Sequence, residues 1–250
     1  PRKAAWNRLA FYNLTDMERT AEALKYADAL FNASDSSKFT GFDYTYYGTA
    51  LKNDKQYEKA IEMFNKAMEE NKGNDELVNS NRKALSDLYL AKEDFDKATA
   101  YYEEYLNHAS KTTASDMAGL ATIYMNLAAK QTGEQQKASF KKADNVYARL
   151  GEKFPANLDF ANFMRARINS NLDPETKEGL AKPFYEAIVN SLANKTDRDK
   201  ADNARLTEAY RYLGYYYLVK NDKAMADGYW KKVLEIDPEN ETAKQALGIK

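Results

Sequence analysis

This 250-residue chain contains few groups of side chains whose types and spacing are suited to catalysis. The paired carboxylates Glu69–Glu70 and Glu103–Glu104 are adjacent on expected amphipathic helices, where neighbouring residues point in different directions. They therefore indicate solvated surface and not a general acid–base pair. The single histidine, His108, falls near an expected helix end, and no G-x-S-x-G, H-E-x-x-H or P-loop string occurs. We expect no catalytic residues.

Metal-binding chemistry is equally poorly represented. The chain has no cysteine, and one histidine cannot build a histidine-rich zinc site. Asp197, Asp199 and Glu208 have the first, third and twelfth spacing of a calcium loop, but Ala201 replaces a ligand and Asp202 replaces the required glycine. The sequence therefore predicts neither a metal nor another cofactor.

Composition limits the fold and the partners. The 37 Lys and Arg residues nearly balance 38 Asp and Glu residues, so the basic surplus that neutralises nucleic-acid phosphates is absent. Many alanines (37) and few valines (5) and isoleucines (6) favour helices over sheets. No apolar run approaches the roughly 20 residues that span a bilayer. We expect an all-α protein that neither binds nucleic acid nor inserts into a membrane.

Three segments share one pattern of aromatic, small and alanine residues. In each, a small residue precedes an alanine by 12 positions: Gly48 and Ala60, Ser86 and Ala98, Gly214 and Ala226. The small residue and the alanine let two antiparallel helices, A and B, approach closely, and aromatic side chains fill the space beside them. The matching residues are Tyr44, Tyr47, Gly48, Leu51, Ala60, Phe64 and Ala67; Leu85, Ser86, Tyr89, Ala98, Tyr102 and Tyr105; and Tyr210, Leu213, Gly214, Tyr217, Ala226, Trp230 and Pro238.

This pattern resembles the tetratricopeptide repeat (TPR), which reads W-x2-L-G-x2-Y, then A-x3-F, then P. The resemblance implies a right-handed superhelix of antiparallel helix hairpins, an α-solenoid. The sequences of residues 94–98 and 214–217 further resemble those of cell-envelope TPR proteins of Bacteroidetes-type bacteria. That resemblance implies a periplasmic or envelope location and a signal peptide upstream of Pro1, although a cytoplasmic location remains open.

We expect one solenoid over residues 1–250. Its parts are a degenerate first hairpin (1–40), two repeats (41–78 and 79–113), a long-helix repeat (114–157), an irregular repeat (158–206), a further repeat (207–240) and a capping helix (241–250). In the first hairpin, Trp6, Leu9 and Ala10 read as helix A, and Thr15 with Glu18 reads as a capping box. Two registers remain open for its helix B: Ala23/Ala27/Leu30 and Thr20/Leu24/Ala27.

The expected binding surface is the concave face of the A helices, where repeat solenoids bind ligands. Its side chains follow the aromatic and the small residue of each A helix. They are Thr45/Thr49, Lys83/Asp87, Ala118/Thr122, Phe163/Arg167 and Arg211/Tyr215. TPR co-chaperones grip terminal carboxylates there with Lys and Asn, a clamp from which Thr45, Thr49 and Asp87 depart.

In the C-terminal half, Phe160 and Phe163 offer flat apolar area and Arg167 and Arg211 offer guanidinium groups, with Tyr215 beside them. This mixture suits an extended peptide or a loop that carries acidic residues. In the alternative interpretation, the arginines bind no ligand because Glu208 or Asp159 neutralises them.

The leading functional interpretation is a non-catalytic scaffold that binds an unidentified protein or peptide in this groove. The alternative is a structural or self-associating module of a longer envelope protein whose groove holds no ligand.

Overall fold

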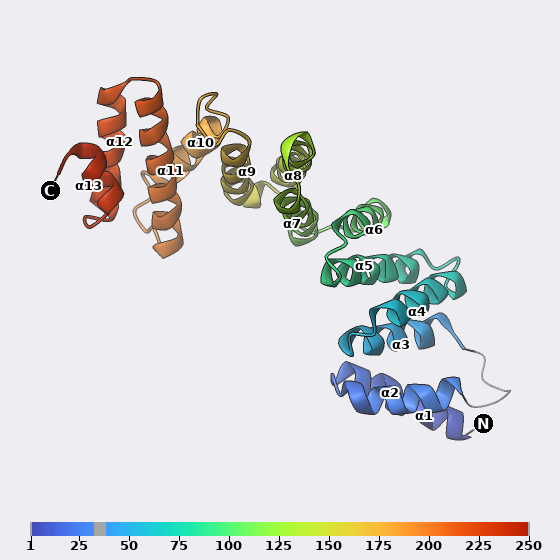
Figure 1. Ribbon diagram of the computed structural model, residues 1–250. Coiled ribbons are helices and arrows are strands. Elements are labelled where there is room, and N and C mark those ends of the chain that lie inside the picture. Colours follow the sequence, from blue (N-terminus) through green and yellow to red (C-terminus); the bar gives the residue numbers. More distant parts are fainter. Residues whose placement is uncertain (1, 33–38, 250) are drawn as a thin grey trace. The chain divides into compact units, whose positions relative to one another are not determined.

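The computed structural model describes residues 2–32 and 39–249, which form thirteen α-helices, one short 3₁₀ helix and no strand (Figure 1). The expected all-α class is confirmed, and most consecutive helices pack as antiparallel hairpins. Contacts within the chain divide it into two compact units, residues 1–112 and residues 113–250. The single solenoid over 1–250 stays a prediction.

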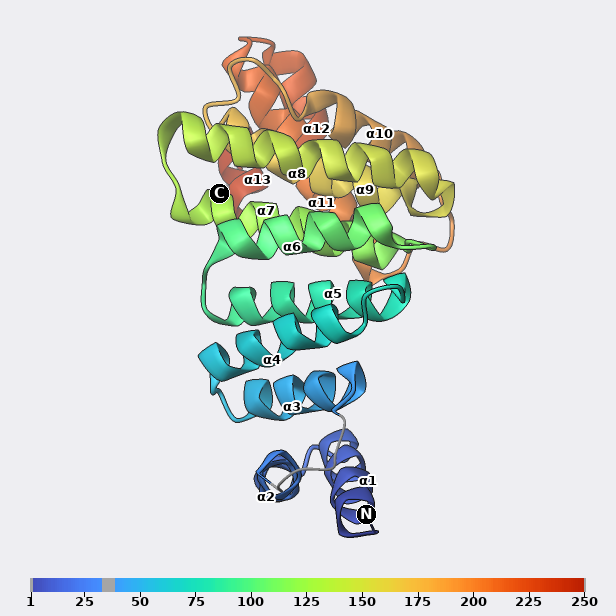
Figure 2. The same ribbon diagram turned by 90° about the vertical axis from the view of Figure 1, so that its right-hand side faces the viewer.

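The first unit contains three hairpins. Their helices are α1 (Arg2–Asp16), α2 (Thr20–Phe31), α3 (Gly41–Asn53), α4 (Tyr57–Glu70), α5 (Asp75–Ala91) and α6 (Phe95–His108). Figure 2 shows α3, α4 and α5 layered one on another. Residues 33–38, which belong to the expected first hairpin (1–40), lie outside the described residues. Helix α5 begins four residues before the predicted repeat start at 79, because the side chain of Asn74 caps it by accepting from the N–H of Leu77.

The second unit continues with helices of unequal length. They are α7 (Ala114–Lys130), α8 (Gly133–Lys153), the 3₁₀ helix η1 (Pro155–Asn157), α9 (Leu158–Leu172), α10 (Lys182–Leu192), α11 (Lys200–Val219), α12 (Lys223–Ile236) and α13 (Glu241–Leu247). Helix α11 begins at Lys200, inside the predicted irregular repeat, because Asp199 caps it. The loop before α10 is held by Asp173, whose carboxylate accepts from the backbone N–H groups of Lys177 and Gly179.

Four turns between A and B helices share one geometry. Glu18, Lys55, Glu93 and Asn221 all have left-handed backbone with φ between 57° and 61°. In each turn the N–H of the next residue donates to the carbonyl five residues earlier, at 2.8–2.9 Å, as in a Schellman motif. The hairpin α1–α2 therefore has the same turn as the three well-matched repeats.

That turn corrects the predicted start of the first hairpin. Thr15 does not cap α2; it lies inside α1, where its hydroxyl donates to the carbonyl of Phe11. Trp6 and Leu9 are 70% and 56% exposed, so they are not the packing residues of helix A. The open register of helix B is decided for Ala23, Ala27 and Leu30, all fully buried.

The first hairpin also exchanges large and small residues across its interface. Elsewhere the small residue lies seven positions before the turn, as Gly48 precedes Lys55, and an aromatic follows it by 16 positions, as Phe64 does. Counted from Glu18, these positions are Phe11 and Ala27, both fully buried in one cluster. A phenyl ring on α1 therefore fills the space that an aromatic on helix B fills in the other repeats.

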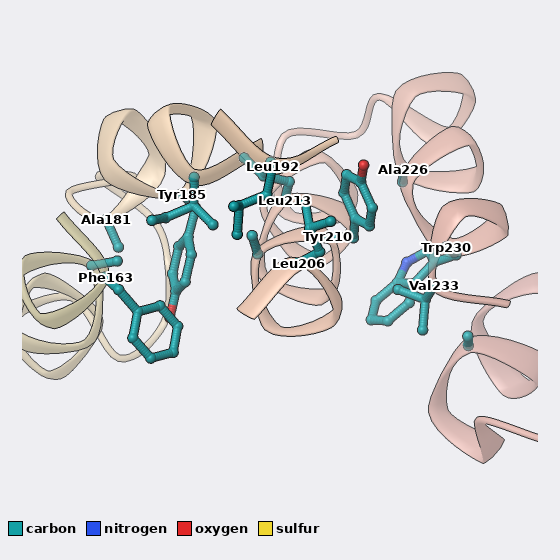
Figure 3. Packing of buried hydrophobic residues seen from close by; sticks show 14 residues of the cluster. Phe163, Ala181, Tyr185, Leu192, Leu206, Tyr210, Leu213, Ala226, Trp230 and Val233 are labelled. Carbon is teal, nitrogen blue, oxygen red and sulfur yellow. The ribbon is translucent and has the colours of Figure 1, made fainter. Parts of the chain in front are cut away.

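A cluster of buried residues from helices α9 to α13 forms the hydrophobic core of this part of the chain (Figure 3). It includes Phe163 from α9, Tyr185 from α10, Leu213 from α11 and Trp230 from α12. Gly214 lets α11 and α12 approach, because a Cβ atom there would come within 2.8 Å of the Trp230 indole. The predicted small-residue contact is thus present in this repeat.

Candidate binding pocket

A cavity of about 460 Å³ opens in the second unit, bounded by α10, α11, α12 and α13. Its lining residues are Tyr185, Glu208, Arg211, Tyr212, Tyr215, Trp230 and Thr242. The volume lies within the usual range for small-ligand pockets, and four of the seven lining residues are aromatic.

Helix α11 supplies four of these residues from one face. Glu208, Arg211, Tyr212 and Tyr215 follow the spacing i, i+3, i+4 and i+7, which places side chains together along a helix. The opposite wall depends on the close approach of α12 at Gly214, which brings Trp230 beneath the site. The pocket is thus a consequence of the A–B packing that the repeat pattern requires.

Glu208 is neutralised within the protein. Its carboxylate accepts two hydrogen bonds from the Arg167 guanidinium on α9, at 2.9 and 2.7 Å, and one from the Tyr185 hydroxyl at 2.9 Å. Donation of hydrogen bonds to the Glu208 carboxylate raises the pKa of Arg167, and burial, together with the nearby negative charge, raises the pKa of Tyr185. These three groups tie three helices together and leave Glu208 little capacity for a ligand.

Arg211 has a different environment on the same helix. Its side chain is exposed, and it makes no ion pair or hydrogen bond with any of the described residues. Because Arg167 and Glu208 cancel each other, Arg211 leaves the pocket with one net positive charge. Arg211 is therefore the charged donor that the pocket presents to solvent.

The tyrosines of the pocket differ in their contact with water. Tyr215 is 48% exposed, whereas burial raises the pKa of Tyr212 to about 12. The amide of Ala181 lies near the Tyr212 hydroxyl and influences that pKa, but no hydrogen bond of good geometry forms, and the hydroxyl is buried without a partner. Tyr215 is accordingly the ring most available to a ligand.

Two of the seven predicted site residues, Arg211 and Tyr215, line the cavity. Phe163 does not: it is 8% exposed, and the guanidinium of Arg167 lies over its ring, 4.4 Å from the centroid. Figure 3 shows the Phe163 ring packed beside Tyr185 in the core. Arg167 adjoins the pocket but is committed to Glu208, so the predicted pair of uncommitted arginines is wrong and the alternative that named Glu208 is right for Arg167.

The other predicted residues lie elsewhere. Phe160 on α9 is half-buried and packs edge-on against Tyr147 of α8. Lys83 and Asp87 are on α5 of the first unit, where the ammonium group of Lys83 lies 4.9 Å from the centroid of the Tyr105 ring. Desolvation raises the pKa of Asp87 even though its side chain reaches solvent, and Lys52 and Lys83 oppose this effect.

Five lining residues were not predicted as site residues. Glu208 and Tyr212 each lie three positions before a predicted residue, Arg211 and Tyr215, so helical periodicity contained the signal for them. Tyr185 and Trp230 have the spacing of repeat packing, and they also line the cavity. Thr242 carries no sequence signal, because only the folding of α13 beside α12 brings it to the site.

Within residues 2–32 and 39–249, no group of three or more His, Cys, Asp or Glu side chains is arranged to hold a metal ion. Two of the three spaced carboxylates have separate structural positions: Asp199 caps α11, and Glu208 binds Arg167. No helix of this described part is long and apolar enough to cross a membrane.

Neither family sequence models nor curated proteins match the chain. Among solved structures, it is similar to the C-terminal part of a TPR repeat-containing protein from Cytophaga hutchinsonii, with 26% identity and a TM-score of 0.69 over 94% of this chain and 83% of that chain. It is also similar to YrrB, a TPR protein with an unusual peptide-binding site, with 17% identity and a TM-score of 0.50 over 84% of this chain and 92% of that one.

A third similar structure is a signal-transduction ATPase with a tetratricopeptide repeat sensor from Pyrococcus horikoshii. The identity is 17% and the TM-score is 0.50. The match covers 97% of this chain and 37% of that chain. The descriptions of all three name tetratricopeptide repeats. The chain therefore has the fold of tetratricopeptide repeat proteins and is similar to one from Cytophaga hutchinsonii.

Proposed function

We propose that the protein is a non-catalytic scaffold that binds a peptide or a protein segment in the pocket between α10 and α13. The observation that carries this proposal is the cavity of about 460 Å³, in which the exposed ring of Tyr215 and the unpaired guanidinium of Arg211 lie on one face of α11. Aromatic residues and arginine are the side chains that contribute most to protein interfaces. The peptide-binding site named for YrrB supports the class of function, although that likeness extends only to the fold.

The pocket's polar groups favour binding over catalysis. Glu208, a potential general base, is held by two hydrogen bonds from Arg167 and one from Tyr185. A raised pKa disfavours the ionised form of Tyr185 that a nucleophile or base would need. Neither Glu208 nor Tyr185 is therefore poised for proton transfer.

The proposal is tested by selecting random 12-residue peptides displayed on phage against the immobilised 250-residue protein. Enriched peptides are labelled with fluorescein and titrated by fluorescence anisotropy. We expect Tyr215→Ser to weaken binding at least tenfold. The matched control is Tyr26→Ser on α2, a tyrosine of similar exposure (41%) in the first unit, and it should leave affinity unchanged. Peptides that bind equally well to both variants would place the binding site elsewhere.

Self-association is the second candidate function, favoured by one observation. Three large apolar side chains on and beside α1 are exposed: Trp6 (70%), Leu9 (56%) and Met17 (62%). Several exposed apolar side chains on one element are typical of a surface that contacts another protein. Light scattering after gel filtration tests it: a mass that rises with concentration and returns to 28.5 kDa in Trp6→Ser/Leu9→Ser favours this candidate.

We also propose a periplasmic or envelope location, which rests on resemblance to Bacteroidetes envelope TPR proteins. Fractionation of the native cells, followed by immunoblotting, tests it. Recovery of the protein in the cytoplasmic fraction alone would refute it.

A further inference from the structure

We propose that the pocket between α10 and α13 selects a peptide in which an aromatic side chain is directly followed by an acidic residue. This inference rests on the proposed function and names the ligand chemistry of the same site. Its two halves come from separate features of the pocket, the charge of Arg211 and the exposed ring of Tyr215.

The acidic half follows from the charges on α9 and α11. The Glu208 carboxylate is engaged by Arg167 and Tyr185, so it neither repels an incoming carboxylate strongly nor pairs with Arg211. Arg211 keeps its guanidinium donors for a ligand, since none of the described residues bonds to it. Guanidinium groups bind carboxylates through two parallel N–H···O bonds, which makes a peptide carboxylate the best-matched acceptor.

The aromatic half follows from the walls. Tyr185, Tyr212, Tyr215 and Trp230 line a single cavity, and aromatic rings pack well against one another in offset or edge-on geometry. Tyr215, one helical turn beyond Arg211, presents nearly half of its side chain to solvent. A ligand ring against Tyr215 therefore lies within one residue's reach of a carboxylate on Arg211, because the two protein groups are four residues apart on one helix face.

The charge also disfavours cationic ligands. Aromatic pockets can bind cations through their ring faces, but such sites lack a positive group of their own. The exposed Arg211 repels a lysine or a quaternary ammonium group from this pocket. An acidic peptide is thus favoured over a basic one by the same residue.

The test uses the two tryptophans as reporters. The chain contains only Trp6 and Trp230, so a ¹⁵N-labelled protein gives two indole N–H signals, assigned with a Trp6→Phe variant. Trp230 lies at the pocket and Trp6 is on α1 of the first unit, which makes Trp6 an internal control. The probes are three peptides blocked at both ends: acetyl-Gly-Gly-Trp-Glu-Gly-Gly-amide, the same peptide with Gln for Glu, and the same peptide with Gly for Trp.

We expect the Trp-Glu peptide to shift the Trp230 signal and leave the Trp6 signal in place. Its Kd should be at least tenfold below that of the Trp-Gln peptide, a difference of about 1.4 kcal/mol. Arg211→Gln should abolish the preference for Glu over Gln. Arg149→Gln, an exposed arginine on α8 outside the pocket, should preserve it. Added salt should reduce the preference, because the contact is exposed.

Equal binding of the Trp-Glu and Trp-Gln peptides would overturn the acidic half, and equal binding of the Trp-Glu and Gly-Glu peptides would overturn the aromatic half. Absence of a Trp230 shift with all three peptides would overturn the ligand class as a whole. The proposed function fails separately, when peptides selected from the random library ignore Tyr215→Ser. A library peptide that needs Tyr215 but contains no acidic residue would leave the scaffold function standing and refute the inference.

Discussion

The indole of Trp230 lies directly against Gly214, so that a Cβ atom on Gly214 would come within 2.8 Å of Cε2 and 2.9 Å of Nε1. An indole ring held between two helices cannot rotate away as the end of a flexible side chain can. The closeness of α11 and α12, and with it the position of Trp230 at the pocket, therefore depends on the absence of a side chain at residue 214.

The first prediction compares two glycines of this hairpin. Gly214→Ala should destabilise the protein by about 1–3 kcal/mol, because the methyl group overpacks against Trp230. Gly228→Ala on α12 should stabilise it by about 0.5–1 kcal/mol, because no atom lies within 4 Å of the added methyl and alanine favours the helix. Urea unfolding measures both. Equal effects of the two substitutions would contradict the packing described here.

The second prediction concerns the exchanged residues of the first hairpin. Phe11→Ala should cost about 3–5 kcal/mol through the cavity it leaves. Ala27→Phe alone should cost about 1–3 kcal/mol through overpacking. Combined, the two changes restore the arrangement of the other repeats, and the double variant should be more stable than Phe11→Ala. A double-mutant cycle with strictly additive losses would show that the two sites do not share one space.

The third prediction concerns the ion pair between Arg167 and Glu208. Their side chains are 48% and 32% exposed, so water and salt screen the attraction. We expect a coupling energy of only about 0.3–1 kcal/mol from the cycle Arg167→Gln, Glu208→Gln and both. Glu208→Gln should still strengthen the binding of an acidic peptide, because it leaves Arg167 and Arg211 both positive. Anisotropy titrations check this, and weaker binding of the acidic peptide would be inconsistent with it.

The fourth prediction concerns a buried charge in the first unit. Asp43 is fully buried and accepts hydrogen bonds from Arg8 and Tyr12 of α1 and from Thr40 at its own helix start. Asp43→Asn should lower the free energy of unfolding by about 3 kcal/mol or more, because it removes the negative charge and one of the two acceptor oxygens that these partners share. The same change at Asp94, a partly exposed cap of α6, should be nearly neutral, since Asn and Asp cap equally well. Similar losses from the two changes would refute a special role for Asp43.

The fifth prediction concerns alkaline pH. Burial raises the pKa of Tyr47 and of Tyr212 to about 12 from the ordinary value near 10. The folded state therefore keeps these protons where the unfolded state loses them. Their contribution to stability is complete below pH 10 and is lost as the pH rises from 10 to 12. The loss is at most about 1.4 kcal/mol per group and pH unit, reduced by solvent screening.

Urea midpoints between pH 9 and pH 11 measure this loss. The variant Tyr47→Phe/Tyr212→Phe should lose less stability over that interval than the wild type. Lysines also titrate there, and the same lysines are present in both proteins, which isolates the tyrosine contribution. Parallel pH dependence of the two proteins would contradict the raised pKa values.

Local pattern determined much of this fold. Alanine content and the 12-residue spacing predicted helical hairpins, because a small residue opposite an alanine lets two helices pack closely. Gly214, Ala226 and Trp230 could be placed from sequence alone for this reason. Arg211 and Tyr215 could be assigned to the exposed face of α11 because helical periodicity fixes the direction of side chains along one helix.

Tertiary structure decided the features that depend on residues distant in sequence. Arg167 meets Glu208 across 41 positions, and no periodicity selects that carboxylate over Asp159, which instead accepts a hydrogen bond from Ser191. Phe163 has the spacing of a groove residue but is buried, because Arg167 and Arg205 lie over its ring. The first hairpin shows the same limit: a helical pattern gives a face, but the left-handed turn at Glu18 set which residue, Phe11, enters the interface.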